Sequence, residues 1–299
     1  MPKTIVITGI TGFLGSLIAA AQVSAGNKVI GIVRPTSDLS RLALIYDQIT
    51  LVDGAMENLD KFFAEGVDAV VHTATCYGRE NEPASTILES NVSFPLRLVE
   101  TCLKYKVKNF INTDTFFTSN LSPDANLAGY SASKRQFVEW TRIAFAGSPV
   151  VFANVRIEHL YGPGDHESKF VSWVVRECLN NVKQLNLTSG MQQRDFIYVD
   201  DAVSAFCCLL DSTNVIGSGY HQLGLGTGKV TSIRSFIEAV HNISGSTTTL
   251  NFGTLPYREH EQMLSVADNS YLISLGWKFR TELNEGIYKI ILDMRKNLL

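Results

Sequence analysis

The stretch TGITGFLG, residues 8–15, decides the fold of this chain. It directly follows the apolar run Thr4–Thr8, which has the composition of a buried strand, and directly precedes a longer apolar run with helical spacing. A strand that turns tightly into a helix needs residues without a Cβ atom. A glycine triplet in this context is typical of a Rossmann unit that binds a dinucleotide pyrophosphate at the helix N-terminus. The expected contacts of the pyrophosphate are Gly9, Gly12, Phe13, Leu14 and Gly15.

The pattern around this loop predicts an α/β fold. Short apolar runs alternate with longer stretches of helical period through most of the first 165 residues, as in a doubly wound parallel sheet with crossover helices. Residues 89–105 show the clearest amphipathic helix. The expected strands are Thr4–Thr8, Lys28–Val33, Thr50–Asp53, Ala69–His72, Asn109–Thr113 and Val150–Arg156.

The alternation fades after Tyr161, where glycine-rich turns break the chain into shorter pieces. We therefore expect residues 1–165 to form the dinucleotide-binding Rossmann domain, completed by about 199–226. Residues 166–198 and 227–299 would form a smaller C-terminal α/β lobe that binds the substrate.

Composition narrows the class of partner. The 299 residues are 45% hydrophobic and carry a net charge of −3 without a run of Lys or Arg, so we expect neither nucleic acid nor a membrane as a partner. Five cysteines without CxxC spacing indicate neither a disulfide framework nor a zinc site, and the six histidines show no metal-ligand spacing. We expect no metal, a small-molecule substrate and a reducing cytoplasmic location.

The end of the second strand indicates which dinucleotide binds. An acidic residue there is typical of NAD sites, whereas an arginine suits the extra phosphate of NADP. This strand ends in Arg34, and the first carboxylate after it is Asp38, so we expect NADPH. The alternative is that Arg34 and Arg41 are solvated surface charges. Asp53, after the third strand, is a candidate contact for the adenine.

The stretch YSASK, residues 130–134, carries the candidate catalytic pair. Tyr130 and Lys134 lie four residues apart, so on a helix they share one face. A protonated lysine beside a tyrosine lowers the pKa of the phenol, which makes it a usable proton donor near neutral pH.

Together these motifs resemble the extended short-chain dehydrogenase/reductases, in the NAD-dependent epimerase/dehydratase branch. The resemblance implies that Tyr130 is the catalytic acid/base and that Lys134 tunes it and holds the nicotinamide ribose. It also implies that Thr115 orients the substrate carbonyl, with Thr113 as the alternative. The matching stretches are TGITGFLG, DAVVHTAT, ESNVSFPLRLVE, KNFINTDT, YSASK, VRIEHLYGPGD, QQRDFIYVDDAVSAF and YREHEQMLSVADN followed by LGWKF.

Departures from the family pattern indicate the reaction. The 4,6-dehydratases carry an Asp and a Glu after the catalytic threonine, where this chain has Phe116 and Phe117, which transfer no protons. Asp114 would imitate the first of that pair only in a register shifted by two. Epimerases of the family retain NAD and usually carry the acidic residue that Arg34 replaces. A net reduction by NADPH at a sugar C4 keto group fits better.

Several strings, among them CYGRENEPASTILESN and LTSGMQQRDF, are similar to the reductases that make CDP-abequose and CDP-paratose. This implies reduction of CDP-4-keto-3,6-dideoxy-D-glucose in the biosynthesis of dideoxyhexoses of lipopolysaccharide O-antigen. The alternatives are a dTDP-, GDP- or UDP-linked 4-ketoreductase, an NAD(P)-dependent 4-epimerase and a non-catalytic dinucleotide sensor. The nucleotide base, the C4 configuration and the presence of a 3-hydroxyl stay open.

The resemblance assigns the remaining contacts and implies a homodimer formed through helices near Glu89 and Tyr130. Arginine forks suit the substrate diphosphate, and a lone His159 is expected to be structural. The additional cofactor contacts are Ala74 and Asn91, and the substrate contacts are Thr75, Tyr77, Lys169, Arg194 and Arg258.

Overall fold

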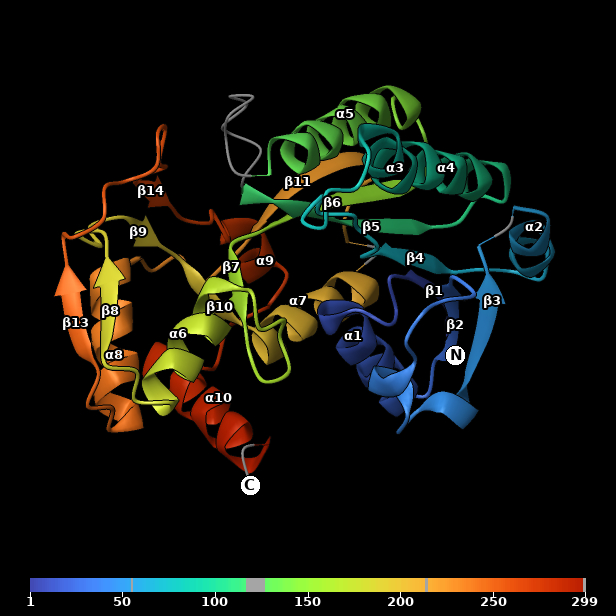
Figure 1. Ribbon diagram of the computed structural model, residues 1–299. Helices are drawn as coiled ribbons and strands as arrows, with labels where there is room; N and C mark the ends of the chain where they lie inside the picture. Colours follow the sequence, from blue (N-terminus) through green and yellow to red (C-terminus); the bar gives the residue numbers. More distant parts are fainter. Residues whose placement is uncertain (55, 117–126, 213–214, 298–299) are drawn as a thin grey trace. The chain divides into compact units, whose positions relative to one another are not determined.

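The structure is a computed structural model that describes residues 1–54, 56–116, 127–212 and 215–297 (Figure 1). Its contacts divide the chain into two compact units, each built from three segments. Unit 1 consists of Met1–Arg156, Val203–Leu223 and Tyr271–Trp277. Unit 2 consists of Ile157–Ala202, Gly224–Ser270 and Lys278–Leu299.

The first unit ends earlier than residue 165, where the sequence pattern placed the boundary. Ile157 begins unit 2 because the chain then bonds within that unit: the amide of Glu158 donates to the carbonyl of Leu225 over 3.0 Å. A second difference is Tyr271–Trp277, which belongs to unit 1 although the pattern assigned it to the C-terminal lobe. The assignment of unit 2 to substrate binding stays a prediction.

A seven-stranded sheet forms the centre of unit 1. Its strands are β1 (Thr4–Thr8), β2 (Lys28–Val33), β3 (Ile49–Asp53), β4 (Ala69–His72), β5 (Asn109–Thr115), β6 (Val151–Ile157) and β11 (Gly219–Leu225). They follow the order β11-β6-β5-β4-β1-β2-β3, and β1 to β5 pair in parallel. The predicted doubly wound Rossmann sheet is confirmed. The strand order reverses between β1 and β4, and ligands of such sheets bind beyond the carboxyl ends of the strands at this point.

Strand β5 is longer than the pattern predicted. It reaches Thr115, two residues beyond Thr113, and all seven of its residues are buried although five are polar. Buried polar groups require partners. Thr113 Oγ1 donates to the carbonyl of His72 over 3.0 Å, and Asn112 Nδ2 donates to Asn154 Oδ1 over 2.6 Å. These bonds allow a polar strand inside the sheet.

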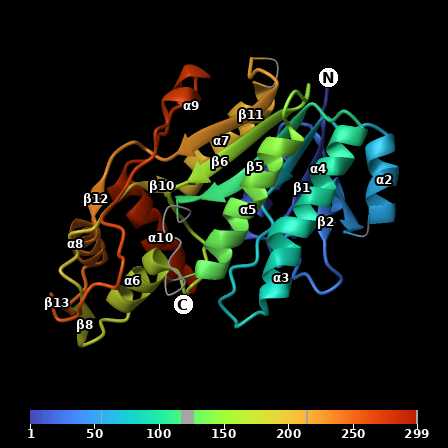
Figure 2. The same cartoon turned by 90° about the horizontal axis from the view of Figure 1, so that it is seen from above.

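Helices cover both faces of this sheet (Figure 2). The expected single helix over residues 89–105 is a π-helical turn, Glu89–Ser93, followed by α4. Such turns occur frequently at functional sites. The helices of unit 1 are α1 (Phe13–Ser24), α2 (Met56–Ala64), α3 (Ala84–Leu88), α4 (Phe94–Lys104), α5 (Ala128–Ala144), α9 (Ser270–Ser274) and, from Val203, α7 (Val199–Asp211).

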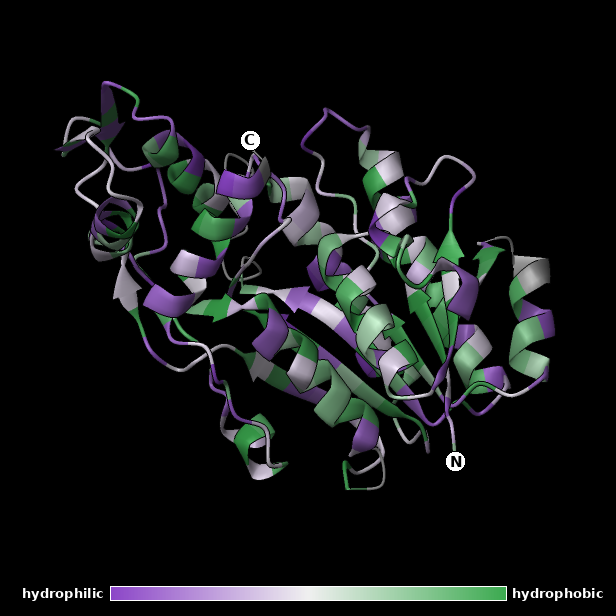
Figure 3. Cartoon of the chain, turned by 90° about the horizontal axis from the view of Figure 1, so that it is seen from below, coloured by the Kyte–Doolittle hydropathy of each residue, from purple (hydrophilic) through white to green (hydrophobic). Residues whose placement is uncertain are grey.

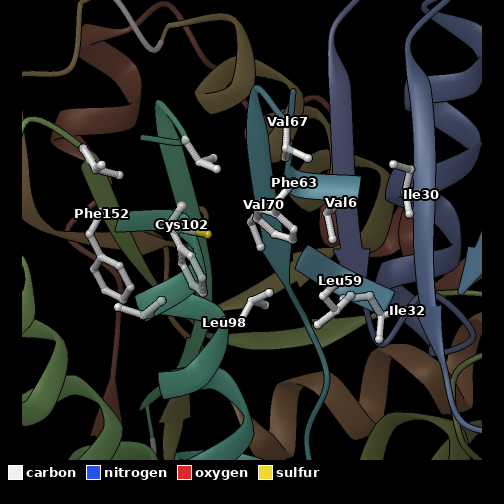
Figure 4. Close-up of a cluster of buried hydrophobic side chains, with 14 of the residues drawn as sticks. Val6, Ile30, Ile32, Leu59, Phe63, Val67, Val70, Leu98, Cys102 and Phe152 are labelled. Carbon is white, nitrogen blue, oxygen red and sulfur yellow. The ribbon is translucent and has the colours of Figure 1, made fainter. Parts of the chain in front are cut away.

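The main apolar core lies between the sheet and α2, α4 and α5 (Figure 4). Val6, Val70 and Phe110 contribute from three strands, and Leu98 and Phe137 contribute from α4 and α5. In Figure 3, hydrophobic residues predominate along several strands of this sheet. Each fully buried side chain of this kind stabilises the fold by about 1.5–3 kcal/mol. The core therefore fixes the strand ends that carry the polar residues described below.

Unit 2 combines small sheets with three packed helices. The helices are α6 (Phe170–Leu179), α8 (Ile233–Ser244) and α10 (Leu283–Asn297), and each contacts the other two. The ring of Phe236 on α8 stacks on that of Phe196 at a centroid distance of 4.4 Å. The strand pairs are β7 (His159–Tyr161) with β10 (Phe196–Tyr198), β8 (Gln184–Leu187) with β13 (Thr249–Phe252), and β9 (Gln193–Arg194) with both β12 (Thr231–Ser232) and β14 (Leu264–Ser265).

Within the ranges described, no helix combines the length and the apolar character needed to cross a membrane.

Candidate active site

The glycine loop is packed so tightly that side chains are excluded. Gly9 has φ +65°, and a Cβ atom there would lie 2.6 Å from the amide nitrogen of Ala74. A Cβ atom on Gly15 would overlap the Gly9 carbonyl, which already accepts a hydrogen bond from the Gly12 amide over 2.9 Å. Gly12 is the N-cap of α1, and Phe13 is its first residue. The predicted pyrophosphate contacts thus surround a helix N-terminus at which three glycines leave the backbone open to close approach, which fits a dinucleotide phosphate.

Hydrogen bonds tie the carboxyl ends of β1 and β4 together beside this loop. Thr73 Oγ1 donates to the carbonyl of Thr8 over 2.7 Å, and the Ala74 amide donates to Thr8 Oγ1 over 3.3 Å. Thr8 Oγ1 also bonds His72 Nδ1 over 2.7 Å. Burial and the charge of Lys134 lower the pKa of His72 well below its usual value, so His72 is neutral. It is a structural residue.

The residues predicted to select the dinucleotide lie around the same strand ends. Arg34 directly follows β2 and is exposed. It lies near enough to Cys76, beyond β4, for its charge to oppose the rise in the thiol pKa that burial causes. The guanidinium of Arg41 lies 6.0 Å from the ring centroid of Phe13. Asp53 ends β3 with an exposed side chain. Both arginines therefore lie within unit 1 near the glycine loop or the end of β4.

The structure brings Thr115 and Tyr130 together. Thr115 ends β5, Tyr130 lies in the first turn of α5, and a hydrogen bond joins their side chains. Lys134 follows one turn later and donates from Nζ to the carbonyl of Thr113 over 2.8 Å. The hydroxyl of Thr113 instead bonds the carbonyl of His72, so Thr115 is the hydroxyl that meets the phenol.

The expected lowering of the Tyr130 pKa is wrong for this structure. Tyr130 is 6% exposed, and burial raises the pKa of its phenol well above the usual value. Tyr77 and Asp114 also raise it, whereas the hydrogen bond from Thr115 and the charge of Arg79 lower it. Burial likewise lowers the pKa of Lys134 to about 8, against the opposing charge of Asp114. Desolvation therefore outweighs the charge effects at this site.

Asp114 belongs to a buried polar network behind the site. Its Oδ1 accepts from the Thr115 amide over 2.8 Å, and its Oδ2 accepts from Asn154 Nδ2 over 2.8 Å. Asn154 Nδ2 also donates to Gln222 Oε1 over 2.9 Å. Burial raises the pKa of Asp114, but these donors oppose the shift. The network assigns Asp114 a structural role, which argues against the shifted register.

The two residues predicted in place of the dehydratase acid pair are only partly described. Phe116 is 8% exposed and follows β5 directly. Phe117 lies outside the described residues. The prediction that neither position transfers protons rests on their side chains alone.

Asn91 connects the segment after β4 to α5. Its Oδ1 accepts from the amide of Cys76, and its Nδ2 donates to the carbonyl of Cys76, both over 2.8 Å. Nδ2 also donates to Ser133 Oγ, which in turn donates to the carbonyl of Tyr130. Both Nδ2 protons are thus used within the protein, so Asn91 supports the site from inside. Next to Cys76, the buried Thr75 Oγ1 has no hydrogen-bond partner among the described residues.

Two further side chains from this segment extend the site. The ring of Tyr77 packs on that of Tyr130 at a centroid distance of 4.9 Å. The guanidinium of Arg79 lies over the ring of Tyr77, 4.7 Å from its centroid. Sequence reasoning included Tyr77 but missed Arg79, because a loop residue shows no periodic signal. The only available signal was a cation two residues after a candidate aromatic.

Unit 2 holds the predicted diphosphate contacts. Arg194 is 6% exposed; its Nη2 contacts Glu261 Oε1 over 2.9 Å, and burial lowers its pKa. Arg258 is exposed on the segment that carries Glu261, so unit 2 brings the two arginines onto adjoining segments. Lys169 Nζ pairs with the buried Asp165 over 2.8 Å. Its ammonium already neutralises a carboxylate.

His159 lies beside Arg194 in unit 2 and is not a proton-transfer group. It is half-buried, its ring contacts that of Phe196 at a centroid distance of 5.6 Å, and desolvation lowers its pKa to about 3. Among the described residues, no group of three or more His, Cys, Asp or Glu side chains is arranged to hold a metal.

Comparison with known proteins identifies the family. Residues 5–221 match the model of the NAD dependent epimerase/dehydratase family. CDP-abequose synthases from Salmonella muenchen and Salmonella typhimurium are each 32% identical to this chain, over 97% of it and 97% and 98% of their own lengths. The UDP-glucose 4-epimerase of Thermotoga maritima, solved with UDP-glucose, has a TM-score of 0.85 at 20% identity and covers 99% of this chain and 100% of its own.

A second solved structure, the UDP-glucuronic acid 4-epimerase of Bacillus cereus in complex with UDP-glucuronic acid and NAD, has a TM-score of 0.82 at 22% identity. It covers 98% of this chain and 99% of its own. At such identities the structural likeness shows a shared fold. The family match and the 32% identical relatives agree with the motifs at the glycine loop and at Tyr130. The chain belongs to the NAD dependent epimerase/dehydratase family, as its sequence motifs predicted.

Proposed function

We propose that this protein reduces the C4 keto group of a nucleotide-linked deoxysugar with NADPH. The observation that carries the proposal is the hydrogen-bonded pair Thr115–Tyr130 at the end of β5, in the same unit as the glycine loop. Thr115 holds the carbonyl oxygen, and Tyr130 donates a proton to that oxygen as negative charge develops on it. When bound, the dihydronicotinamide supplies the hydride. Lys134 holds the nicotinamide ribose and keeps a positive charge near the phenol.

The dinucleotide is proposed to be NADPH because of two cations near its expected position. Gly9, Gly12 and Gly15 fit a pyrophosphate, which supports a nicotinamide dinucleotide of either kind. Arg34 takes the place of the acidic residue that NAD sites use for the ribose, and Arg41 lies beside Phe13. A guanidinium fork suits a phosphate better than a hydroxyl pair. Asp53 is the proposed contact of the adenine, and Ala74 is a further proposed contact of the dinucleotide.

The proposed substrate is CDP-4-keto-3,6-dideoxy-D-glucose, and the product is CDP-abequose or CDP-paratose. The CDP-abequose synthases, which align over nearly the whole chain at 32% identity, support this choice. Thr75 and Tyr77 would contact the sugar. Arg194 and Arg258 would neutralise the diphosphate. Lys169 would also contact the nucleotide while it remains paired with Asp165.

The test is a substrate panel. The protein is mixed with NADPH and with CDP-, dTDP-, UDP- or GDP-linked 4-keto sugars, the absorbance at 340 nm is followed, and the C4 configuration of the product is determined by NMR. We expect stoichiometric oxidation of NADPH with the CDP-linked sugar. Interconversion of C4 epimers without net NADPH consumption, by protein that purifies with bound NAD, would instead identify an epimerase.

We also propose that a second copy of this chain covers an apolar groove between α4 and α5. Trp140 and Ile143 on α5 are 55% and 68% exposed and line the same groove, and contiguous exposed apolar side chains mark interaction sites. Sedimentation equilibrium should give a dimer, and Ile143→Glu should give a monomer, whereas Ile273→Glu, on α9, should stay dimeric. The groove is lined by Leu96, Val99, Glu100, Trp140, Ile143 and Ala144.

A further inference from the structure

The segment after β4 carries a cation that none of the predicted roles uses. Arg79 is exposed, and its guanidinium lies 4.7 Å from the centroid of the Tyr77 ring. The Tyr77 ring in turn packs on that of Tyr130 at 4.9 Å with an interplanar angle of 38°. The three side chains form a continuous stack, here called the Arg79 stack, which ends on the candidate proton donor.

The backbone that carries Arg79 is tightly held. Gly78 has φ +70°, and a Cβ atom there would lie 2.8 Å from Ile87 Cδ1. Glu82 accepts from the amide of Glu80 over 2.8 Å and from the thiol of Cys76 over 3.4 Å. Cys76 is itself fixed at both its amide and its carbonyl by Asn91. The backbone on both sides of Arg79 is therefore held in place by the loop.

We propose that Arg79 is a positioning residue that acts on Tyr130 through Tyr77. A cation on the face of one ring of a packed aromatic pair favours negative charge on the neighbouring phenol, because the two opposite charges attract each other at short range. Proton donation leaves Tyr130 as a phenolate, so a nearby cation stabilises the state that the reaction produces. This inference rests on the proposed reduction, in which Tyr130 is the proton donor.

The charges that face Tyr130 make Arg79 consequential. Asp114 at β5 raises the pKa of the phenol, as does Tyr77, whereas Arg79 and the hydrogen bond from Thr115 lower it. On α5, Lys134 lies one turn from Tyr130 and is bonded to a carbonyl of β5. Arg79 thus supplies positive charge from the segment after β4, beside Tyr77. Replacing Arg79 by a neutral residue should therefore raise the pKa of Tyr130 further, because burial and Asp114 already raise it.

The kinetic test compares Arg79→Gln with Arg79→Lys. Glutamine removes the charge, so kcat should fall about three- to fivefold with the KM for NADPH unchanged. Lysine retains the charge and should recover most of kcat. The matched control is Lys104→Gln, which removes an exposed ammonium from the ring of Tyr105, 4.8 Å away, on the outer helix α4; it should have wild-type kcat. Equal losses in both Arg79 variants would refute the proposal, and so would an effect confined to the KM for the sugar.

A second readout needs no substrate and separates failure of this inference from failure of the proposed reaction. The ten tyrosines are labelled with ¹³C at Cζ, and the Tyr130 signal is assigned by its loss in Tyr130→Phe. The Tyr130 titration in Arg79→Gln should move to higher pH by about half a unit, and Arg79→Lys should restore it. Equal midpoints in all three proteins, or a Tyr130 signal that never titrates before unfolding, would overturn the role of Arg79 whatever the enzyme reduces.

Discussion

The carboxyl ends of β1 and β5 solve different physical problems. At the end of β1, Gly9 and Gly15 make room, and the loop works because side chains are absent. At the end of β5, the properties of Thr115, Tyr130 and Lys134 depend on burial, on hydrogen bonds between side chains and on neighbouring charges. The first region depends on backbone sterics, and the second depends on desolvation and hydrogen bonds. Substitutions in the two regions should therefore fail in different ways.

The largest effect is expected at the glycine loop. In Gly15→Ala, the new methyl group would overlap the Gly9 carbonyl, so the loop must move; we expect a loss of about 1–3 kcal/mol in the free energy of unfolding and no measurable binding of NADPH. Urea unfolding and fluorescence titration measure the two quantities. Gly217→Ala is the matched control, since nothing lies within 4 Å of its added Cβ atom. Wild-type NADPH binding by Gly15→Ala would refute the steric account.

The next largest effect distinguishes the two threonines of β5. Thr115→Val removes the hydroxyl that meets Tyr130, so kcat should fall about 100-fold, as for loss of one oxyanion donor. Thr113→Val removes only a bond to the carbonyl of His72 and should cost about 1 kcal/mol of stability with little change in kcat. The reverse pattern in steady-state kinetics would restore the alternative assignment to Thr113.

A smaller effect is expected where the dinucleotide is selected. Arg34→Ala should weaken NADPH binding about tenfold and leave NADH binding nearly unchanged, because only NADPH carries the extra phosphate. Calorimetric titration with both dinucleotides gives the ratio. An equal loss for the two would show that Arg34 does not read the phosphate, and Arg41→Ala then tests the neighbouring cation.

The smallest effect concerns pH. The pKa of Lys134 is about 8 in the folded chain, so kcat should fall as the pH rises through that value and the ammonium is lost. The contribution of Lys134 to stability should change in the opposite direction. Between pH 8 and its usual pKa near 10.5, the unfolded chain holds more protons, so this contribution rises with pH. Both kcat and unfolding are measured against pH for the wild type and for Lys134→Met. A fall in kcat that coincides with unfolding in both proteins would contradict the assignment.

The difference between the regions also explains what the sequence could predict. The predicted bounds of β1, β2 and β4 and the turn at the glycine loop were correct, because they depend on local sterics and apolar patterning. Thr113 and Thr115 could not be separated, because residues two apart on a strand share a face. Only the pairing register, in which β4 ends opposite Asn112, shows that Thr113 bonds the last carbonyl of β4 and Thr115 extends beyond it.

Electrostatic expectations failed for a related reason. The spacing of Tyr130 and Lys134 predicted a lowered phenol pKa, but burial raises it, and burial depends on residues distant in the sequence. Asn91 was predicted as a cofactor contact, whereas its amide is used by Cys76 and Ser133. Arg79 was not predicted, since its loop has no periodicity and the one signal was its position two residues after Tyr77. Charge and solvation at a site require the tertiary structure.

The measurement that tests the account most directly is a pair of assays on Tyr130→Phe. One follows NADPH binding by fluorescence, and the other follows NADPH oxidation in a single turnover with CDP-4-keto-3,6-dideoxy-D-glucose. We expect NADPH binding close to that of the wild type, because the glycine loop is untouched, and a rate lower by at least about 100-fold, because the proton donor is lost. Oxidation at the wild-type rate would contradict it.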